Sequence, residues 1–234
     1  MKKIVPIVLI IVYIICVLGM TYFDFGLGNA VTISLIFIVI LFIALFESKS
    51  MDSKTMSVLA ILSALGGVLR IPCAVIPGFN PVTFICAIAG YTYGPVNGFM
   101  IGSMSAFISN FFLGHGPWTL WQMLGWGLCG VFFGIFRKII KKFGFKGFVI
   151  CCTIWGYVYG FILNQWYIIN YFRPITLEAI LAGSISSFGH DTLHAIGNFM
   201  FSMMFGKNFI KVLERYKSKS NIKYLDVEEK NSYE

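Results

Sequence analysis

The sequence predicts an all-α, polytopic integral membrane protein, and three observations support that prediction. Of the 234 residues, 58% are hydrophobic and 12% are charged, and the mean hydropathy is +0.81, whereas soluble domains carry roughly 25% charged residues. The apolar runs are long and uninterrupted rather than alternating, which favours helices over strands. Hydrocarbon offers no water to backbone amides, so each run must pair its own backbone groups as a helix.

Apolar runs and their breakers divide the chain into about eight helices, and a bilayer crossing takes roughly 20 residues. The first two form an N-terminal transmembrane hairpin within residues 1–52, six more form a core within 53–212, and 213–234 is a basic and acidic tail. The predicted helices cover, within two to four residues at each end, 4–21, 30–46, 55–70, 81–93, 96–113, 118–136, 147–170 and 177–206.

The start of the chain resembles a signal peptide, because Lys2 and Lys3 precede an apolar run. No small-x-small cleavage site follows cleanly, and a second apolar span begins at Ala30. We therefore expect a retained signal-anchor helix.

Charge predicts the orientation of these helices. With the N-terminus in the cytoplasm, only Arg70 and Arg173 of the 18 Lys and Arg residues lie outside, as the positive-inside rule requires. Both termini are then cytoplasmic. The net charge of +8 reflects this topology, and no soluble domain carries the basic face that nucleic-acid binding needs. The basic segment from Lys207 onward is expected to extend the last helix near anionic headgroups.

Three connectors on the predicted outer side differ from the rest of the chain. PCAVIPGFNP, LGHGPWT and YFRPIT are rich in Gly, Pro and aromatic residues and poor in charge. Irregular backbone at membrane depth is tolerated where it lines a cavity enclosed by protein. We therefore predict an outward-facing pocket with these connectors as its walls or lid.

Polar residues inside apolar helices are the next signal, because they are costly there. Asn110, His115 and Gln122 lie close in sequence to Trp118 and Trp121. Hydrogen-bonding groups beside aromatic rings suit a polar, partly planar ligand. The alternative is that the tryptophans are interfacial anchors at the outer headgroup layer.

The sequence His190-Asp191-x-x-His194 places a carboxylate and two imidazoles in the last helix, with Asn198 on the same face as the histidines. A buried carboxylate needs a partner, and the histidines can supply one. The spacing imitates the HExxH zinc motif, but Asp replaces Glu and no third ligand is evident, so we favour a polar packing cluster without metal.

Two further groups of residues share helical faces. Trp155 and Tyr159 recur on one side of the seventh predicted helix, either as core or as an aromatic wall of the pocket. Ala60 and Ala64, with Gly67 continuing their face, form a small-residue stripe that lets another helix approach closely. From spacing alone, ordinary packing within the chain explains this stripe.

The sequence carries no phosphate-cradling GxxxxGK[ST] loop and no convincing catalytic arrangement. We therefore predict no enzymatic activity and no cofactor. If the protein drives uphill transport with ATP, another subunit must hydrolyse it.

Residues 57–219 resemble the substrate-specific (S) components of energy-coupling factor (ECF) transporters, more narrowly the subgroup linked to cobalamin or its precursors. The matching runs are AILSALGGVLR, FNPVTFICAIAGYTYGPVNGFMIGSMSAFISNFFLGHGPWTLWQMLGWGLCGVFFG and HDTLHAIGNFMFSMMFGKNFIKVLERYKSK. The blocks SNFFLGHGPWTLWQ and DTLHAI are specific, and both occur in order.

This resemblance implies a six-helix core that captures a vitamin from outside, and a partner module of one membrane scaffold protein and two ATPases. It implies that Ala60 and Ala64 contact the scaffold, with Gly67 on the same stripe. The expected substrate-binding residues, from the resemblance and from the polar and aromatic patterns, are Phe79, Asn80, Asn110, His115, Trp118, Trp121, Gln122, Trp155, Tyr159, Asp191 and His194.

The chain departs from the family pattern at two positions. His190 stands where a hydrophobic residue commonly precedes the Asp, and His115 stands where Gln is more usual before Gly-Pro-Trp. Both departures leave the identity of the ligand open. Two alternatives remain beside the S component: an intramembrane metal-dependent enzyme that uses His190, Asp191 and His194, and a facilitator that works without ATPases.

Overall fold

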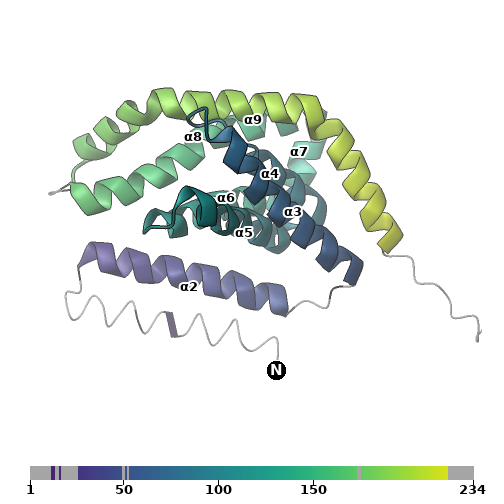
Figure 1. Cartoon of the computed structure of the whole chain (residues 1–234), viewed down its shortest axis with the longest axis horizontal. Helices are drawn as coiled ribbons and strands as arrows, with labels where there is room; N and C mark the ends of the chain where they lie inside the picture. Colours follow the sequence, from purple (N-terminus) through teal and green to yellow (C-terminus); the bar gives the residue numbers. More distant parts are fainter. Residues whose placement is uncertain are drawn as a thin grey trace, which may run out of the picture.

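The computed structural model describes residues 12–13, 16, 26–48, 51, 53–172 and 175–220, and these form helices joined by connectors, with no strand among them (Figure 1). The all-helical prediction is therefore confirmed, whereas the first predicted span, 4–21, lies almost entirely outside the described residues. The helices are α2 (Leu27–Glu47), α3 (Ser53–Cys73), α4 (Val82–Tyr93), α5 (Pro95–Leu113), α6 (Trp118–Ile135), α7 (Arg137–Lys142), α8 (Gly144–Tyr171) and α9 (Leu177–Ser220).

Five of these helices are long and apolar enough to cross a membrane, namely α2, α3, α5, α6 and α8. Together with the composition, they make the chain a multi-pass membrane protein. The total of eight spans and the side on which each terminus lies stay predictions.

One element differs from the sequence-based expectation, and another confirms it. The basic stretch between the sixth and seventh predicted helices contains the short helix α7, and α8 already begins at Gly144, whose φ of 66° favours glycine. The last helix, α9, runs for 44 residues to Ser220, so the basic segment from Lys207 extends it as predicted. Figure 1 shows α9 lying along α8 and then bending past the rest of the bundle.

The centre of the bundle is α4, because all of its 12 residues are buried. Glycines let α4, α5 and α6 cross with their backbones in contact. A Cβ atom added to Gly130 of α6 would overlap the backbone of Gly98 in α5, and one added to Gly90 of α4 would overlap the carbonyl group of Gly130. Such small residues allow close approach in a membrane, where lipid is as apolar as leucine.

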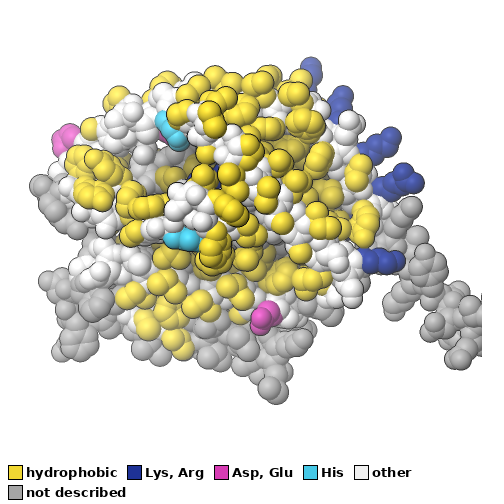
Figure 2. Space-filling model, in the orientation of Figure 1, with side chains coloured by type: hydrophobic (Ala, Val, Ile, Leu, Met, Phe, Trp, Pro, Cys, Tyr) yellow, Lys and Arg dark blue, Asp and Glu magenta, His cyan; other side chains and the backbone are white. Residues whose placement is uncertain are grey.

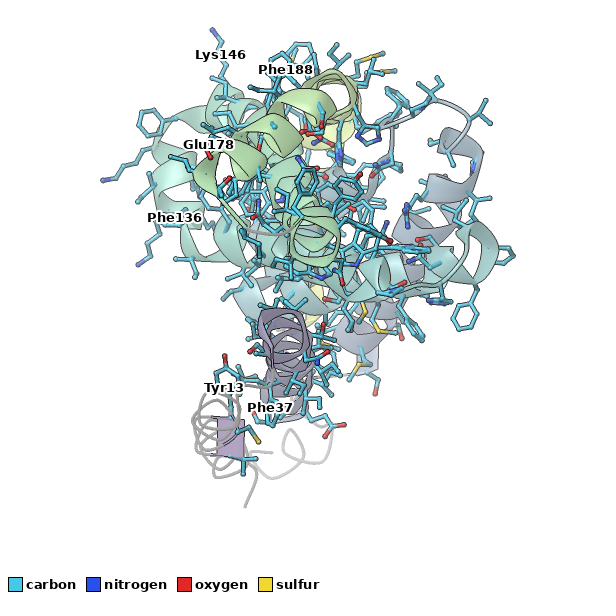
Figure 3. The ribbon with its side chains drawn as sticks, turned by 90° about the vertical axis from the view of Figure 1, so that its left-hand side faces the viewer. Tyr13, Phe37, Phe136, Lys146, Glu178 and Phe188 are labelled. Carbon is cyan, nitrogen blue, oxygen red and sulfur yellow. The ribbon has the colours of Figure 1, made fainter. Side chains whose placement is uncertain are left out.

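Helix α2 lies beside this bundle. The rings of Phe42 in α2 and Phe99 in α5 stack with centroids 3.8 Å apart. Figure 3 shows α2 at the foot of the molecule, with Tyr13 against Phe37. Tyr13 also donates a hydrogen bond to Ser34 at 3.2 Å, so the described part of the preceding segment packs on α2.

Basic side chains gather at one end of the bundle. They come from α7, from the start of α8 and from the last part of α9, and Figure 2 shows Lys and Arg side chains along the edge beside that part of α9. This basic end corresponds to the predicted inner side. The opposite end, where α3 and α5 finish and α6 begins, corresponds to the predicted outer side.

Candidate functional site

A cavity of about 330 Å³ lies at the end of the bundle opposite the basic end. Its walls come from α3, the connector 74–80, α5, α6, α8 and α9. The lining residues are Arg70, Ala74, Ile76, Pro77, Gly78, Phe79, Asn80, Leu113, Gln122, Trp126, Tyr159, Leu163, His190 and His194.

The connector 74–80 forms one wall of the cavity and packs against α9. Gly78 has a φ of 76°, and a Cβ atom added there would lie 2.7 Å from the carbonyl oxygen of His190, so only glycine fits both the backbone and the contact. The ring of Phe79 lies 5.0 Å from that of Phe201 in α9. Asn80 accepts a hydrogen bond from the backbone N–H of Val82 at 3.2 Å, which fixes the entry into α4.

Arg70 lies in the last turn of α3 and reaches across to α5. Its Nη1 donates to the hydroxyl of Ser109 at 2.7 Å and to Oδ1 of Asn110 at 2.8 Å. The guanidinium carbon lies 4.8 Å from the centre of the Trp126 ring, a cation–π distance. The guanidinium group is therefore held in place from two sides.

A column of rings continues from Arg70 across the cavity floor. The rings of Trp126 and Tyr159 stack at 4.4 Å, and His194 follows at 5.0 Å from Tyr159. The Thr83 hydroxyl accepts a hydrogen bond from the Trp126 indole at 3.1 Å and lies 2.9 Å from Nε2 of His194. Side chains from α4, α6, α8 and α9 thus fix one another, which gives the cavity a preorganised floor.

A buried amide network supports the Arg70 side of the cavity. Nδ2 of Asn110 donates to Oε1 of Gln122 at 2.7 Å and to the hydroxyl of Thr119 at 3.0 Å. Asn110 is only 2% exposed, so these bonds and the one from Arg70 satisfy an amide that water does not reach. Gln122 faces the cavity from this network.

Asp191 lies next to the cavity lining but is held between α8 and α9. Ser187 donates to its Oδ2 at 2.7 Å, and Nδ1 of His190 lies 3.7 Å from its Oδ1. Gly160 of α8 leaves the room that this carboxylate occupies, because a Cβ atom there would overlap it. His190 and His194 line the cavity, and no group of three His, Cys, Asp or Glu side chains within the described ranges is arranged to hold a metal ion.

The structure separates the predicted site residues into three groups. Five of them line the cavity: Phe79, Asn80, Gln122, Tyr159 and His194. Asn110 and Asp191 lie behind the lining, in the hydrogen-bond networks described above.

The other four predicted residues lie elsewhere. His115 is exposed, with its ring 4.8 Å from that of Phe111, and Trp118 meets Trp166 at 5.7 Å. Trp121 is buried outside the lining. Trp155 is buried one helical turn from Tyr159 and donates its indole N–H to the carbonyl of Gly125 at 3.3 Å.

Sequence reasoning did not include Arg70 and Trp126 among the site residues, although both line the cavity. The available signal for Arg70 was its isolation, as one of two cations on the predicted outer side. Trp126 follows Gln122 by one helical turn and so shares its face.

The small-residue stripe of α3 is divided between two environments. Ala60 and Ala64 are exposed, beside the exposed side chains of Ile61 and Val68. Gly67 is instead buried against α5, where a Cβ atom would lie 2.8 Å from the side chain of Ile108. The exposed part of the stripe is therefore the two alanines.

Comparison with known proteins gives a consistent result. Residues 54–214 match the family model described as "ECF transporter, substrate-specific component". A UPF0397 protein of Aliivibrio fischeri (strain MJ11) is 32% identical over 125 residues, which cover 48% of this chain and 68% of the relative. A UPF0397 protein of Vibrio vulnificus (strain YJ016) is 27% identical over 188 residues, covering 74% of this chain and 98% of the relative. No solved structure matches the chain.

Proposed function

The chain belongs to the family of substrate-specific components of ECF transporters, and from that premise we propose that it captures a vitamin or vitamin precursor from outside the cell. A scaffold membrane protein and two ATPase subunits then complete the importer. The ATPases supply the energy for transport, because the sequence of this chain contains no GxxxxGK[ST] loop for nucleotide binding. The chain itself is a membrane-embedded transporter subunit rather than an enzyme.

The observation that carries this proposal is the cavity at the end of the bundle away from the basic residues. The positive-inside rule assigns the basic end to the cytoplasm, which turns the cavity toward the outside. Its lining combines aromatic rings with a small number of fixed polar groups, as small-molecule sites do. The Trp126–Thr83–His194 hydrogen bonds hold that lining in place before a ligand arrives.

The volume of the cavity supports a ligand of modest size. About 330 Å³ lies at the lower end of the range of 300–1,000 Å³ for small-molecule pockets. The proposed ligand is therefore a vitamin or vitamin precursor, and cobalamin-related precursors are one class of candidate.

Native mass spectrometry of the purified protein tests the capture of a small molecule. We expect one co-purifying compound that is bound in a 1:1 ratio and is lost after partial unfolding. A protein that carries no small molecule, and that acquires none from an extract rich in water-soluble vitamins, contradicts the proposal. Uptake that survives deletion of the ATPase genes of the host supports the facilitator instead.

Docking of the scaffold is proposed at the exposed alanines of α3. Ala60 and Ala64 leave backbone accessible between larger side chains, which allows a partner helix to approach. Hydrophobic side chains cover the face seen in Figure 2, so the subunit is suited to tilt within lipid when the ATPases turn over.

Ala60→Leu and Ala64→Leu test this contact. We expect each to lower recovery of the scaffold and ATPases in co-purification at least about tenfold, or about 1.4 kcal/mol, while ligand binding is retained. Ala182→Leu, at an exposed alanine of α9, is the matched control. Recovery that is unchanged in both α3 variants rejects the contact.

A further inference from the structure

Arg70 supplies a fixed positive charge to the cavity, and no acidic side chain is among the described residues that line it. The other titratable side chains in the lining are Tyr159, His190 and His194. The nearby carboxylate of Asp191 is held between α8 and α9 by Ser187. Within the part of the chain that the structure describes, Arg70 forms no ion pair.

The guanidinium group is only partly used by the protein. A guanidinium has five N–H donors in a planar fork, and the hydrogen bonds of Arg70 to described residues use Nη1 alone. Both acceptors, the Ser109 hydroxyl and the Asn110 amide oxygen, are neutral. The Nε–H and the two Nη2–H donors form no hydrogen bond to the described residues, on a residue that lines the cavity.

An unpaired charge at this depth is expensive to keep. Arginine within a membrane span costs several kcal/mol unless it is paired or reaches water. The position of Arg70 in the last turn of α3 recovers a part of that cost from the helix dipole. A purely structural link between α3 and α5 does not need a positive charge, because a neutral amide also donates to Ser109 and Asn110.

The surroundings of Arg70 also fix how it is presented. The guanidinium carbon lies over the ring of Trp126 and Asn110 accepts from Nη1, so the free edge, with Nε and Nη2, is held in place. A planar fork of parallel N–H donors matches the two oxygens of a carboxylate or of a phosphate. Removal of water from such a pair strengthens it.

We propose that the ligand of this cavity carries an anionic oxygen group, a carboxylate or a phosphate, which binds the free edge of Arg70. This inference rests on the proposed capture function and narrows its substrate class. The remainder of the ligand lies along the Trp126–Tyr159 floor, beside the connector 74–80.

The experiment uses the full chain in lipid nanodiscs and yeast extract as the source of small molecules. Wild type, Arg70→Gln, Arg70→Lys and the control Lys138→Gln are incubated with the extract and washed, and retained compounds are identified by mass spectrometry. Lys138 is exposed at the basic end. Phosphatase treatment of a second portion of extract distinguishes the sources, because it removes a phosphate monoester and leaves a carboxylate.

The affinity of each variant for the retained compound, and for its methyl ester or amide, is then measured by calorimetry. We expect wild type and Lys138→Gln to retain one anionic compound, and Arg70→Gln to bind it at least about thirtyfold more weakly. Arg70→Lys lies between them. Neutralising the ligand weakens wild-type binding by a similar factor and adds little to the loss in Arg70→Gln.

Each other result overturns a defined claim. A retained compound that is neutral or cationic, or an anion that Arg70→Gln binds as wild type does, overturns the anion site and leaves the capture function standing. Retention of no compound by wild type overturns the capture function itself. If Arg70→Gln does not fold, the comparison of the acid with its ester on wild type and Arg70→Lys decides the question.

Discussion

The two ends of the bundle handle an arginine in opposite ways. At the basic end, Arg137 pairs with Glu214 at 3.0 Å, and its guanidinium carbon lies 5.5 Å from the centre of the Tyr91 ring. At the other end, Arg70 also lies over an aromatic ring, that of Trp126, but its hydrogen-bond acceptors are neutral. The basic end thus supplies its own counter-charge, whereas Arg70 has no acidic partner among the described residues.

Helix packing also differs between the two ends and is tighter at the basic end. Toward the basic end, α4, α5 and α6 meet backbone to backbone at Gly90, Gly98 and Gly130. Lys217 donates to the carbonyl of Thr92 there at 2.7 Å, and burial lowers the pKa of its ammonium group. Toward the other end, the helices separate around about 330 Å³ of space. Close helix packing at the basic end therefore contributes to stability, whereas the space between the helices at the other end can admit a ligand.

The largest expected effect is on stability, from Gly130→Ala. The new methyl group overlaps the backbone of Gly98, which has no side chain to move aside. We expect a loss of about 2–3 kcal/mol in the free energy of unfolding, measured by thermal or denaturant unfolding in detergent. Gly189→Ala is the control, because a Cβ atom there meets nothing within 4 Å. Equal stability of the two variants contradicts the conclusion that the helix backbones at the basic end are too closely packed to accept a methyl group.

Next in size is the effect of supplying Arg70 with an acid. Asn110→Asp places a carboxylate at the position that now accepts from Nη1. We expect the affinity for the retained anion to fall about tenfold, because the charge of Arg70 is then partly neutralised. Titration calorimetry measures this, with the neutral ester of the ligand as the control, whose affinity should fall less. An anion affinity equal to that of wild type contradicts the contrast between the two arginines.

The smallest effect is expected at the basic end, from Glu214→Gln. The Arg137–Glu214 pair is partly exposed, and such pairs contribute about 0.5 kcal/mol. We expect that loss in unfolding free energy, which decreases with added salt, and a ligand affinity within about twofold of wild type. A clear loss of ligand affinity would show that the two ends are coupled rather than independent.

The sequence predicted the helical class and part of the site for physical reasons that can be named. Uninterrupted apolar runs permit only helices in lipid, and Gly- and Pro-rich connectors mark where the backbone leaves them. Phe79, Asn80 and Gln122, which were expected from the family resemblance, lie in or beside such connectors and line the cavity. Which other residues line the cavity depends on their position along the helix axis, and helical periodicity gives only the face of the helix. Trp155 and Tyr159 share a helical face, yet only Tyr159 lines the cavity, because Trp155 lies one turn away from it.

Arg70 shows a second limit of the sequence. In the sequence, the charge of Arg70 was used only as evidence of membrane topology. The residues next to it in sequence do not indicate its hydrogen-bond partners. Ser109 and Asn110 lie 39 and 40 residues further on, and only the packing of α3 against α5 brings them together. Gly67 illustrates the same point, since its spacing groups it with Ala60 while the fold buries it against α5.

The close packing of Gly78 against the backbone of α9 has a mechanical consequence. Helix α9 contacts the connector 74–80 at His190 and His194. The same helix continues without a break to Ser220 at the basic end. No hinge loop separates the two places, so we expect a force on the cytoplasmic segment to reach the connector through the hydrogen bonds of one helix. A displacement of that segment would thereby change the contact between α9 and Gly78 beside the cavity.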